Sequence, residues 1–231
     1  MDFGLISIII PTYNEAENIG VLLSHIQECS TGIYTEVIVV DATNCGITKE
    51  VAAQYDARFL VSEKGRARQM NAGAKIAAHD ILYFLHADSY PPKNFDQLIE
   101  SSINGNTIAG CFYMGFDSKH PVLRTSGWFT RFNNNWCRGG DQSLFIKREA
   151  FNQIGGFNEE YTILEDNEII PRIRSIGNFT VVQRKLITSA RRYEAHGVFR
   201  LQLIHACVHM GYRLGFSQQS LLNFYKKQLG E

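Results

Sequence analysis

Short apolar runs alternate, along the first hundred residues, with segments in which apolar residues recur at helical spacing. The runs lie at residues 5–10, 36–40, 57–61 and 80–85. The first two are rich in Val and Ile, which is typical of strands buried on both faces of a parallel sheet. Helices are expected at residues 15–28, 48–55, 66–78 and 95–102. Pro11 should stop the first strand, and Asn14 could cap the first helix.

This order of elements predicts an α/β protein with a doubly wound, mostly parallel sheet and helices on both faces. Such sheets bind ligands beyond the carboxyl ends of their strands. Three predicted strands end in polar segments, PTYNE from Pro11, DAT from Asp41 and HAD from His86. A binding site is therefore expected at this edge of the sheet.

The second half of the chain has a different pattern. A longer strand is expected at residues 108–116, then a polar, glycine-containing loop at 133–142, which the segment SLFIKR follows at 143–148. A helix should begin in the acidic segment 164–168 and run through residue 176, followed by strands at 179–182 and 186–188. Two helices, at 197–214 and 217–229, form a C-terminal pair.

Charge and cysteine content narrow the class of protein. Lys plus Arg is 23 and Asp plus Glu is 23, so a basic nucleic-acid-binding protein is not expected. The five cysteines are scattered singly without a CxxC motif, which indicates neither a disulfide framework nor a zinc site and fits a reducing compartment. No apolar run has the length of a signal peptide or a transmembrane helix, so we expect a cytoplasmic protein.

The segment ILYFLHADSY at residues 81–90 raises a specific question. If the strand continues to Asp88, then His86 and Asp88 point the same way, because alternate side chains in a strand share a face. They would then suit a metal or an anionic ligand. The alternative is a polar turn that ends the strand, with Asp88 capping the helix after Pro91 and Pro92.

Seven motifs occur in an order that resembles family 2 glycosyltransferases of the GT-A fold. They are PTYNEAENI, the aspartate after the second strand, KGRARQMNAGA, HADS, GGDQSLFIKR, GGFNE and LEDNE. The chain is most similar to a compact bacterial subgroup in which the usual DxD motif reads HAD, and the likeness extends from residue 6 to about residue 215.

The resemblance implies a hexosyltransferase-like enzyme that moves a sugar from a nucleotide-diphosphate sugar, first of all a UDP-sugar, to an acceptor hydroxyl with inversion. The acceptor would be a carbohydrate or a lipid-linked molecule. A divalent cation, Mn²⁺ or Mg²⁺, would hold the diphosphate. The resemblance also implies one GT-A-like domain over residues 1–231, with a nucleotide-binding half (1–104), an acceptor and catalytic half (105–196) and C-terminal helices (197–231).

The resemblance assigns the donor site to the ends of the early strands. Glu15 could accept ribose hydroxyls and Asp41 a base N–H, although Glu15 would also suit the first turn of a helix. The expected donor-binding residues are Pro11, Thr12, Tyr13, Glu15, Asp41, Lys64, Gly65, Arg66, His86, Ala87, Asp88, Arg191 and Arg192.

The cation requires oxygen ligands, several of which the diphosphate supplies. Asp88 is the expected protein ligand, and His196 could complete the shell. His86 replaces the family's other aspartate, so it could contact donor or metal, or be a hydrogen-bonded histidine ending a strand. Arg191 and Arg192 could neutralise the leaving group. A surface ion-pair role is the alternative for His196 and both arginines.

The second motif departs from the family pattern. The chain has DATNCGIT, so the second carboxylate of the pattern falls at Gly46, where none exists. Thr48 or Asn44 could cap the following helix instead. The identity of the nucleotide is correspondingly open.

An inverting displacement needs one base to take the proton of the acceptor hydroxyl. LEDNE supplies Glu165 and Asp166 near a helix start, and the family assigns the base to the second acid, Asp166. The alternative is that these acids only complement the helix dipole. The expected acceptor or sugar-binding residues are Trp136, Gly140, Asp141 and Gln142.

The C-terminal pair is too apolar for free surface helices. It could pack on the domain, form a dimer contact, or lie at a membrane interface on the inner face of the membrane.

Two other functions of the protein also stay open. A nucleotidyltransferase would share the sheet, but it usually needs glycines and a basic residue after the first strand, which PTYNEAEN lacks. A non-catalytic nucleotide-sugar-binding protein would also fit the departures at His86 and Gly46.

Overall fold

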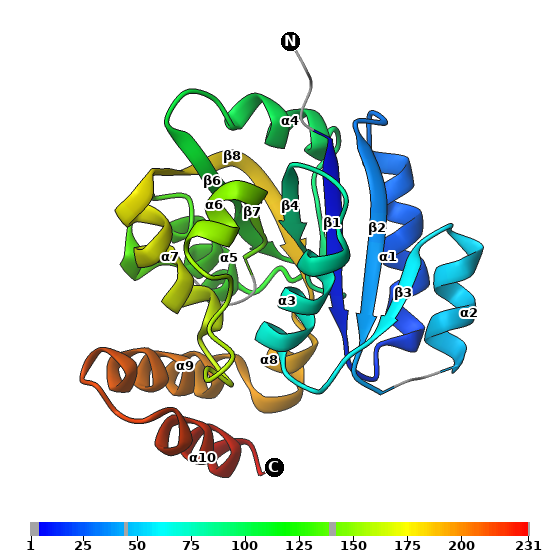
Figure 1. Ribbon diagram of the computed structural model, residues 1–231. Helices are drawn as coiled ribbons and strands as arrows, with labels where there is room; N and C mark the ends of the chain where they lie inside the picture. The colour runs from blue at the N-terminus through cyan, green and yellow to red at the C-terminus, as the bar shows by residue number, and fades with distance from the viewer. Residues whose placement is uncertain (1–4, 44–45, 139–141, 231) are drawn as a thin grey trace.

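A computed structural model describes residues 5–43, 46–138 and 142–230. Within this part of the chain, one eight-stranded sheet has the strand order β3-β2-β1-β4-β7-β6-β8-β5 (Figure 1). The strands are β1 (Ile6–Thr12), β2 (Tyr34–Asp41), β3 (Arg58–Val61), β4 (Ile81–Phe84), β5 (Ser89–Tyr90), β6 (Thr107–Phe116), β7 (Leu144–Lys147) and β8 (Asn178–Thr188). The predicted α/β class, with a mostly parallel sheet, is confirmed.

The first four strands form the parallel half that the hydrophobic pattern predicted. β1 pairs with β2 and β4, and β2 pairs with β3, all in parallel. β1 is buried along its whole length. Its alternate residues enter different cores: Ile8 and Ile10 face one, and Ile9 faces the other. This explains why the strand is apolar throughout rather than alternating.

Helices cover both faces of the sheet (Figure 1). Buried residues of α1 (Ala16–Cys29), α2 (Gly46–Gln54) and α4 (Phe95–Ser102) enter the core that contains Ile8. Those of α3 (Arg66–Ile76), α6 (Arg148–Gln153) and α7 (Glu165–Ile176) enter the core that contains Ile9. Gly73 lets α3 approach β1 closely, because a Cβ there would lie 2.5 Å from Ile9 Cγ2.

The second half adds antiparallel pairings and a third core. β7 is antiparallel to β4 and β6, whereas β6 and β8 are parallel. The remaining helices are α5 (Pro121–Phe129), a 3₁₀ turn (Asn135–Cys137), α8 (Arg191–His196), α9 (Val198–Arg213) and α10 (Gln218–Leu229). The third core contains Leu123 of α5, Tyr193 of α8, Leu201 of α9 and Leu229 of α10. These four helices therefore pack together in one layer. No helix in the described ranges combines the length and hydropathy needed to cross a membrane.

Several sequence predictions of local structure were wrong. β1 continues through Pro11 to Thr12, because its pairing with β4 ends at Ile9 and the missing N–H of Pro11 lies beyond that ladder. Asn14 has a left-handed backbone and Glu15 is the N-cap residue of α1. Thr48 lies inside α2 and its buried hydroxyl has no hydrogen-bond partner, so it caps nothing. Asn44 lies outside the described residues.

Two other differences change how the site is built. Residues 179–182 and 186–188 belong to one strand, β8, whose pairing with β6 absorbs a register shift after Phe112. The short helices α5, α6 and α8 were not predicted. For α5 a signal existed, because Pro121 occupies the first turn and the His120 side chain accepts a hydrogen bond from Val122 N–H.

Candidate active site

The carboxyl ends of β1 and β2 are joined by polar side chains. Thr12 Oγ1 donates to Asp41 Oδ1 over 2.9 Å. Gln69 on α3 donates from Nε2 to the carbonyls of Thr12 and Val40, both at 2.8 Å. Gln69 was missed in the sequence. The sequence did contain a signal for Gln69, because it is a polar residue among the small and apolar residues that α3 buries. A buried amide must find hydrogen-bond partners.

Asp41 holds the turn after β2. Its exposed fraction is 0 %. Besides Thr12, its carboxylate accepts hydrogen bonds from the backbone N–H and the hydroxyl of Thr43, at 3.0 and 2.6 Å. The DAT sequence is therefore a turn closed by its own side chains. The expected contact of Asp41 with a nucleotide base stays a prediction.

The chain does not continue as a strand to Asp88. β4 ends at Phe84, and residues 85–88 cross the edge of the sheet to β5, which pairs with the end of β8. Ser89 and Thr188 share a hydroxyl hydrogen bond of 3.1 Å, and Ser189 N–H donates to the Asp88 carbonyl. The alternative that Asp88 caps a helix is also wrong, because the N-cap residue of α4 is Asn94. This crossing brings Asp88 beside the segment that contains Arg191.

Three charged residues from distant parts of the chain form what we call the outer cluster: Glu15, Asp88 and Arg191. The Arg191 guanidinium makes a two-pronged pair with Glu15, in which Nη1 donates to Oε2 over 3.1 Å and Nη2 donates to Oε1. Arg191 Nη2 also lies 3.6 Å from Asp88 Oδ2. The hydrogen bond to Glu15 raises the pKa of Arg191, so the guanidinium stays positively charged. The cluster is partly exposed, so a ligand can reach it.

Two acids at the start of α7 form what we call the inner pair, Glu165 and Asp166. Both side chains are buried. Glu165 Oε1 lies 3.6 Å from Arg66 Nη1, and Asp166 Oδ2 lies 3.8 Å from His86 Nε2. His86 precedes Asp88 by two residues, so the segment 86–88 contacts the inner pair at one end and the outer cluster at the other. The two sets of charges therefore adjoin one site.

The segment after β3 contributes a further contact. Lys64 Nζ lies 3.8 Å from the centre of the Tyr13 ring, a cation–π contact between two expected donor-binding residues. Gly65 has a φ of 145°, which favours glycine, and its carbonyl accepts the first hydrogen bond of α3 from Gln69 N–H. Arg66 begins α3 directly afterwards, and this places its guanidinium beside Glu165.

The remaining expected residues are more dispersed. Trp136 is exposed and lies under the guanidinium of Arg213, with 3.1 Å from Cζ to the ring centre. Gln142 is buried, and its amide donates to the Phe112 carbonyl over 3.4 Å. Arg192 lies over the Tyr225 ring, away from the outer cluster. His196 is half-buried at the end of α8. Gly140 and Asp141 lie outside the described residues.

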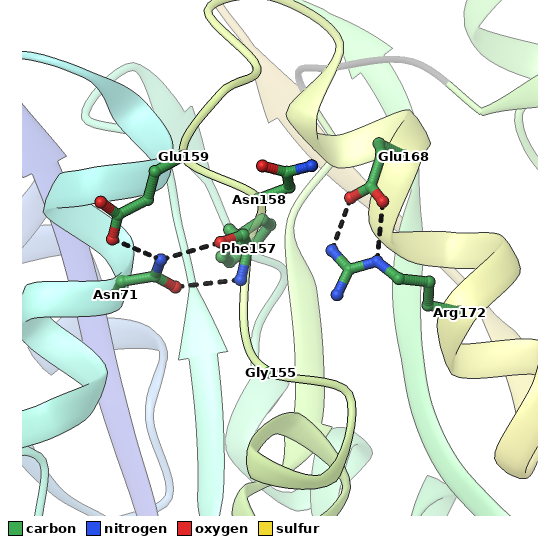
Figure 2. Close-up of a pocket in the computed structure, with 7 residues that line it drawn as sticks. All are labelled: Asn71, Gly155, Phe157, Asn158, Glu159, Glu168 and Arg172. Carbon is green, nitrogen blue, oxygen red and sulfur yellow. Dashed lines mark hydrogen bonds and ion pairs between the residues drawn. The ribbon is translucent and has the colours of Figure 1, made fainter.

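A cavity of about 440 Å³ lies between α3, α7 and the loop that contains GGF, and it includes none of the expected site residues (Figure 2). Its polar groups bind one another. Asn71 donates to the Phe157 carbonyl and accepts from the Phe157 N–H, both at 2.9 Å. Arg172 pairs with Glu168 and donates to the carbonyls of Ile154 and Gly156. The lining residues other than Arg172 belong to the motifs KGRARQMNAGA, GGFNE and LEDNE, but none of them was assigned to the site, and their contacts hold the loop against α3 and α7.

The residues present can be tested against the expected cation. No group of three or more His, Cys, Asp or Glu side chains converges as a metal site within the described residues. Asp88 offers one partly exposed carboxylate, with the His86 imidazole two residues away. Mg²⁺ and Mn²⁺ commonly bind through one or two carboxylates plus substrate phosphates. This donor set therefore fits a cation whose other ligands come from a diphosphate.

Comparison with known proteins gives a family and a fold. Residues 7–158 match the model of the family described as "Glycosyl transferase family 2". Among curated proteins, the dolichol-phosphate mannosyltransferase of Pyrococcus furiosus is 36% identical over 111 residues, which are 45% of this chain and 32% of that protein. The chain spans between about a third and two thirds of the length of the first curated relatives that it matches.

Two solved structures share the fold. The mannosyltransferase PcManGT of Pyrobaculum calidifontis, in complex with GDP-Man and Mn²⁺, has a TM-score of 0.66 and 18% identity, covering 98% of this chain and 72% of that one. Glucosyl-3-phosphoglycerate synthase of Mycobacterium tuberculosis, in complex with Mn²⁺, UDP and glucosyl-3-phosphoglycerate, has a TM-score of 0.61 and 14% identity, covering 98% and 80%. At these identities the likeness concerns the fold alone.

Proposed function

This chain belongs to glycosyl transferase family 2, and from that premise we propose that it moves a sugar from a nucleotide-diphosphate sugar to an acceptor hydroxyl with inversion. The observation that carries the proposal is the meeting of the outer cluster and the inner pair at residues 86–88. It gives one place where a diphosphate can lie beside cationic and metal-binding groups, within reach of a carboxylate base.

The donor side of the proposal rests on the outer cluster. A leaving nucleoside diphosphate carries several negative charges, which need fixed positive partners in the transition state. Arg191 supplies one such charge, and its pairing with Glu15 and Asp88 holds the guanidinium at the site before a ligand arrives. A divalent cation held by Asp88, when bound, adds further charge neutralisation on the diphosphate.

The proposed base is Asp166. In the reaction, the acceptor oxygen forms a bond to the anomeric carbon, the bond from that carbon to the diphosphate breaks, and the hydroxyl proton passes to the base. Asp166 lies in the first turn of α7, where the helix dipole favours the ionised form that a base needs. Glu165 is held by Arg66, so we assign it to positioning the start of α7.

The donor and the acceptor are further parts of the proposal. The two solved neighbours carry a guanosine and a uridine nucleotide, and we take a UDP-sugar as the first donor to test and GDP-mannose as the second. Carbohydrates and lipid-linked molecules are the two proposed classes of acceptor. The P. furiosus relative, named for dolichol phosphate, supports including the second class. We place the reaction on the cytoplasmic side of a membrane.

A thermal-shift screen tests the proposal before any acceptor is known. Nucleoside diphosphates and their sugars are added with and without Mn²⁺ or Mg²⁺, and binding to the folded state raises the melting temperature. We expect one nucleotide to stabilise the chain in a cation-dependent way. Absence of stabilisation by every nucleotide with either cation would support a non-catalytic protein. Release of pyrophosphate from a nucleoside triphosphate and a sugar phosphate would instead indicate a nucleotidyltransferase.

A further inference from the structure

One helix face is apolar along its whole length and faces outward. On α9, Phe199, Leu203 and Met210 recur at helical spacing, and Leu214 follows as the C-cap residue; all four are exposed, Phe199 at 73 % and Leu203 at 66 %. The opposite side of the same helix buries Leu201, Ile204 and Val208 in the third core, which α5, α8 and α10 share. The helix is therefore apolar on two faces, and only one of them is needed for packing within the fold.

A second group of exposed aromatic residues adjoins this helix. Trp128, Phe129 and Phe132 contact one another around the end of α5, with ring centres 5.1 to 6.3 Å apart. α5 and α9 pack together, since His120 and Phe199 lie in ring contact and Gln202 donates to the Ser126 hydroxyl. Arg213 at the other end of α9 lies on Trp136. We call the exposed apolar residues of α9 and of residues 128–136 together the apolar face.

The segments that build this face, together with α10, which packs on α9, carry positive charge only. Residues 119–138 contain four Lys or Arg, of which Arg138 is buried, and residues 197–230 contain four more, without any Asp or Glu in either segment. Together they hold eight of the 23 basic residues and none of the 23 acidic residues of a chain with no net charge. The acidic excess lies entirely elsewhere, so this part of the molecule has a distinct electrostatic character.

Exposed apolar and aromatic residues among unopposed basic residues match the chemistry of a bilayer surface rich in anionic lipid. Tryptophan is also the residue most typical of the boundary between headgroups and acyl chains. An interface between two copies would place these basic charges against one another without an acid to oppose them. We propose that the apolar face docks on the surface of an anionic phospholipid membrane, with α9 lying along it.

The apolar face lies on the same side of the molecule as the candidate active site. α9 follows α8 directly, and α8 begins with Arg191 of the outer cluster. Figure 1 shows α8, α9 and α10 at the end of the sheet toward which the arrows of β1 and β2 point. A membrane against α9 would therefore lie on the same side of the molecule as the candidate active site. This part of the inference rests on the proposed function, whereas the docking itself does not.

The chain contains a built-in probe for the test. Its two tryptophans, Trp128 and Trp136, both belong to the apolar face, so intrinsic tryptophan emission reports on that face alone. The purified chain is mixed with vesicles of phosphatidylcholine, or of phosphatidylcholine with phosphatidylglycerol, without donor or acceptor. We expect co-sedimentation with the anionic vesicles, a blue shift of emission, and weaker binding at high salt.

Matched variants show whether binding depends on the apolar face itself or on exposed apolar residues anywhere on the surface. Phe199→Ser with Leu203→Ser should lower the partition coefficient at least about tenfold. The control, Val21→Ser with Ile47→Ser, removes two apolar residues from α1 and α2 that are 59 % and 62 % exposed, and it should leave binding unchanged. Lys226→Glu with Lys227→Glu should lower it at least about 30-fold, because each basic residue contributes about a fivefold factor near an anionic surface. Lys49→Glu with Lys75→Glu is the control for charge.

Three outcomes would overturn the proposal. The first is no binding to anionic vesicles, and the second is equal binding to neutral ones. The third is a dimer in the absence of lipid, measured by light scattering, that Phe199→Ser with Leu203→Ser converts to a monomer, since the face would then be covered by a second copy. Thermal unfolding of each variant shows whether it folds. Because no sugar transfer is measured, these outcomes do not depend on the proposed reaction.

Discussion

The outer cluster contains two acids and one arginine and the inner pair contains two acids, and the two sets differ in exposure. Arg191, Glu15 and Asp88 keep part of their side-chain surface in solvent. Asp166 is largely buried and Glu165 almost completely. Exposed ion pairs are weak, about 0–1 kcal/mol, so a charged ligand can exchange with them at small cost. A buried carboxylate that loses its partner is far more costly, so its position is fixed.

The difference indicates a division of roles. The exposed charges suit a donor that binds and leaves in each cycle, because their partners can be exchanged. The buried acids suit a group that must stay in one place and accept a proton there. Each prediction below removes one member of one set, and together they test whether the two sets differ as proposed.

The largest effect is expected for Asp166→Asn. The amide keeps the shape of the side chain but cannot accept the acceptor proton, so kcat should fall about 10³-fold. Steady-state transfer from the donor identified by thermal shift measures it. Asp80→Asn, which changes an exposed acid just before β4, is the control and should be silent. If the kcat of Asp166→Asn equals that of the unmodified chain, Asp166 is not the base.

A smaller loss is expected for Asp88→Asn. Without this carboxylate the cation would be held by the diphosphate almost alone, and transfer at saturating donor should fall about 10²-fold. The distinguishing readout is the Mn²⁺ concentration that gives half-maximal activity, which should rise. If activity falls while the metal dependence is unchanged, Asp88 does not hold the cation.

The sequence predicted the inner pair more completely than the outer cluster. LEDNE places Glu165 and Asp166 in the first turn of a helix, and the structure has both there. The pairing of Glu15 with Arg191 joins residues 176 positions apart and depends on the crossing of residues 85–90 to β8. No local pattern specifies such a contact, because it arises only when the sheet is assembled.

The same contrast applies to the fold. The parallel strands of the first half were predicted because each is a mainly apolar run between helical segments. The helices α6 and α8 were missed, because six residues give little periodicity, whereas α5 was missed although Pro121 marks its first turn. Arg192 was grouped with Arg191 as its neighbour. On a helix, however, adjacent side chains point in different directions, and Arg192 lies over Tyr225.

Arg191→Ala should weaken donor binding about 10- to 100-fold, because a charged hydrogen-bond partner of the diphosphate is lost. Arg191→Lys should recover part of the affinity by restoring the charge without the two-pronged geometry. Arg192→Ala should have a smaller effect. Titration calorimetry with the nucleoside diphosphate measures all three. Equal losses for both alanine variants would mean that the contact seen between Arg191 and Asp88 does not mark the donor site.

The smallest effect is expected for Glu165→Gln. The side chain keeps its size and loses only its charge toward Arg66, so kcat/KM should fall less than about tenfold. Donor affinity should hardly change. A loss as large as that of Asp166→Asn would instead make Glu165 the better candidate for the base, and the assignment within the inner pair would be reversed.

The central claim is that the exposed charges bind the donor and the buried acid performs the chemistry. Calorimetric titration of the nucleotide sugar, with Mn²⁺, into the Asp88→Asn and Asp166→Asn variants tests it most directly. We predict that Asp166→Asn binds the donor within about threefold of the unmodified chain, whereas Asp88→Asn binds it at least about tenfold more weakly. Equal loss of donor binding in both variants, or undiminished binding in Asp88→Asn, would contradict the account.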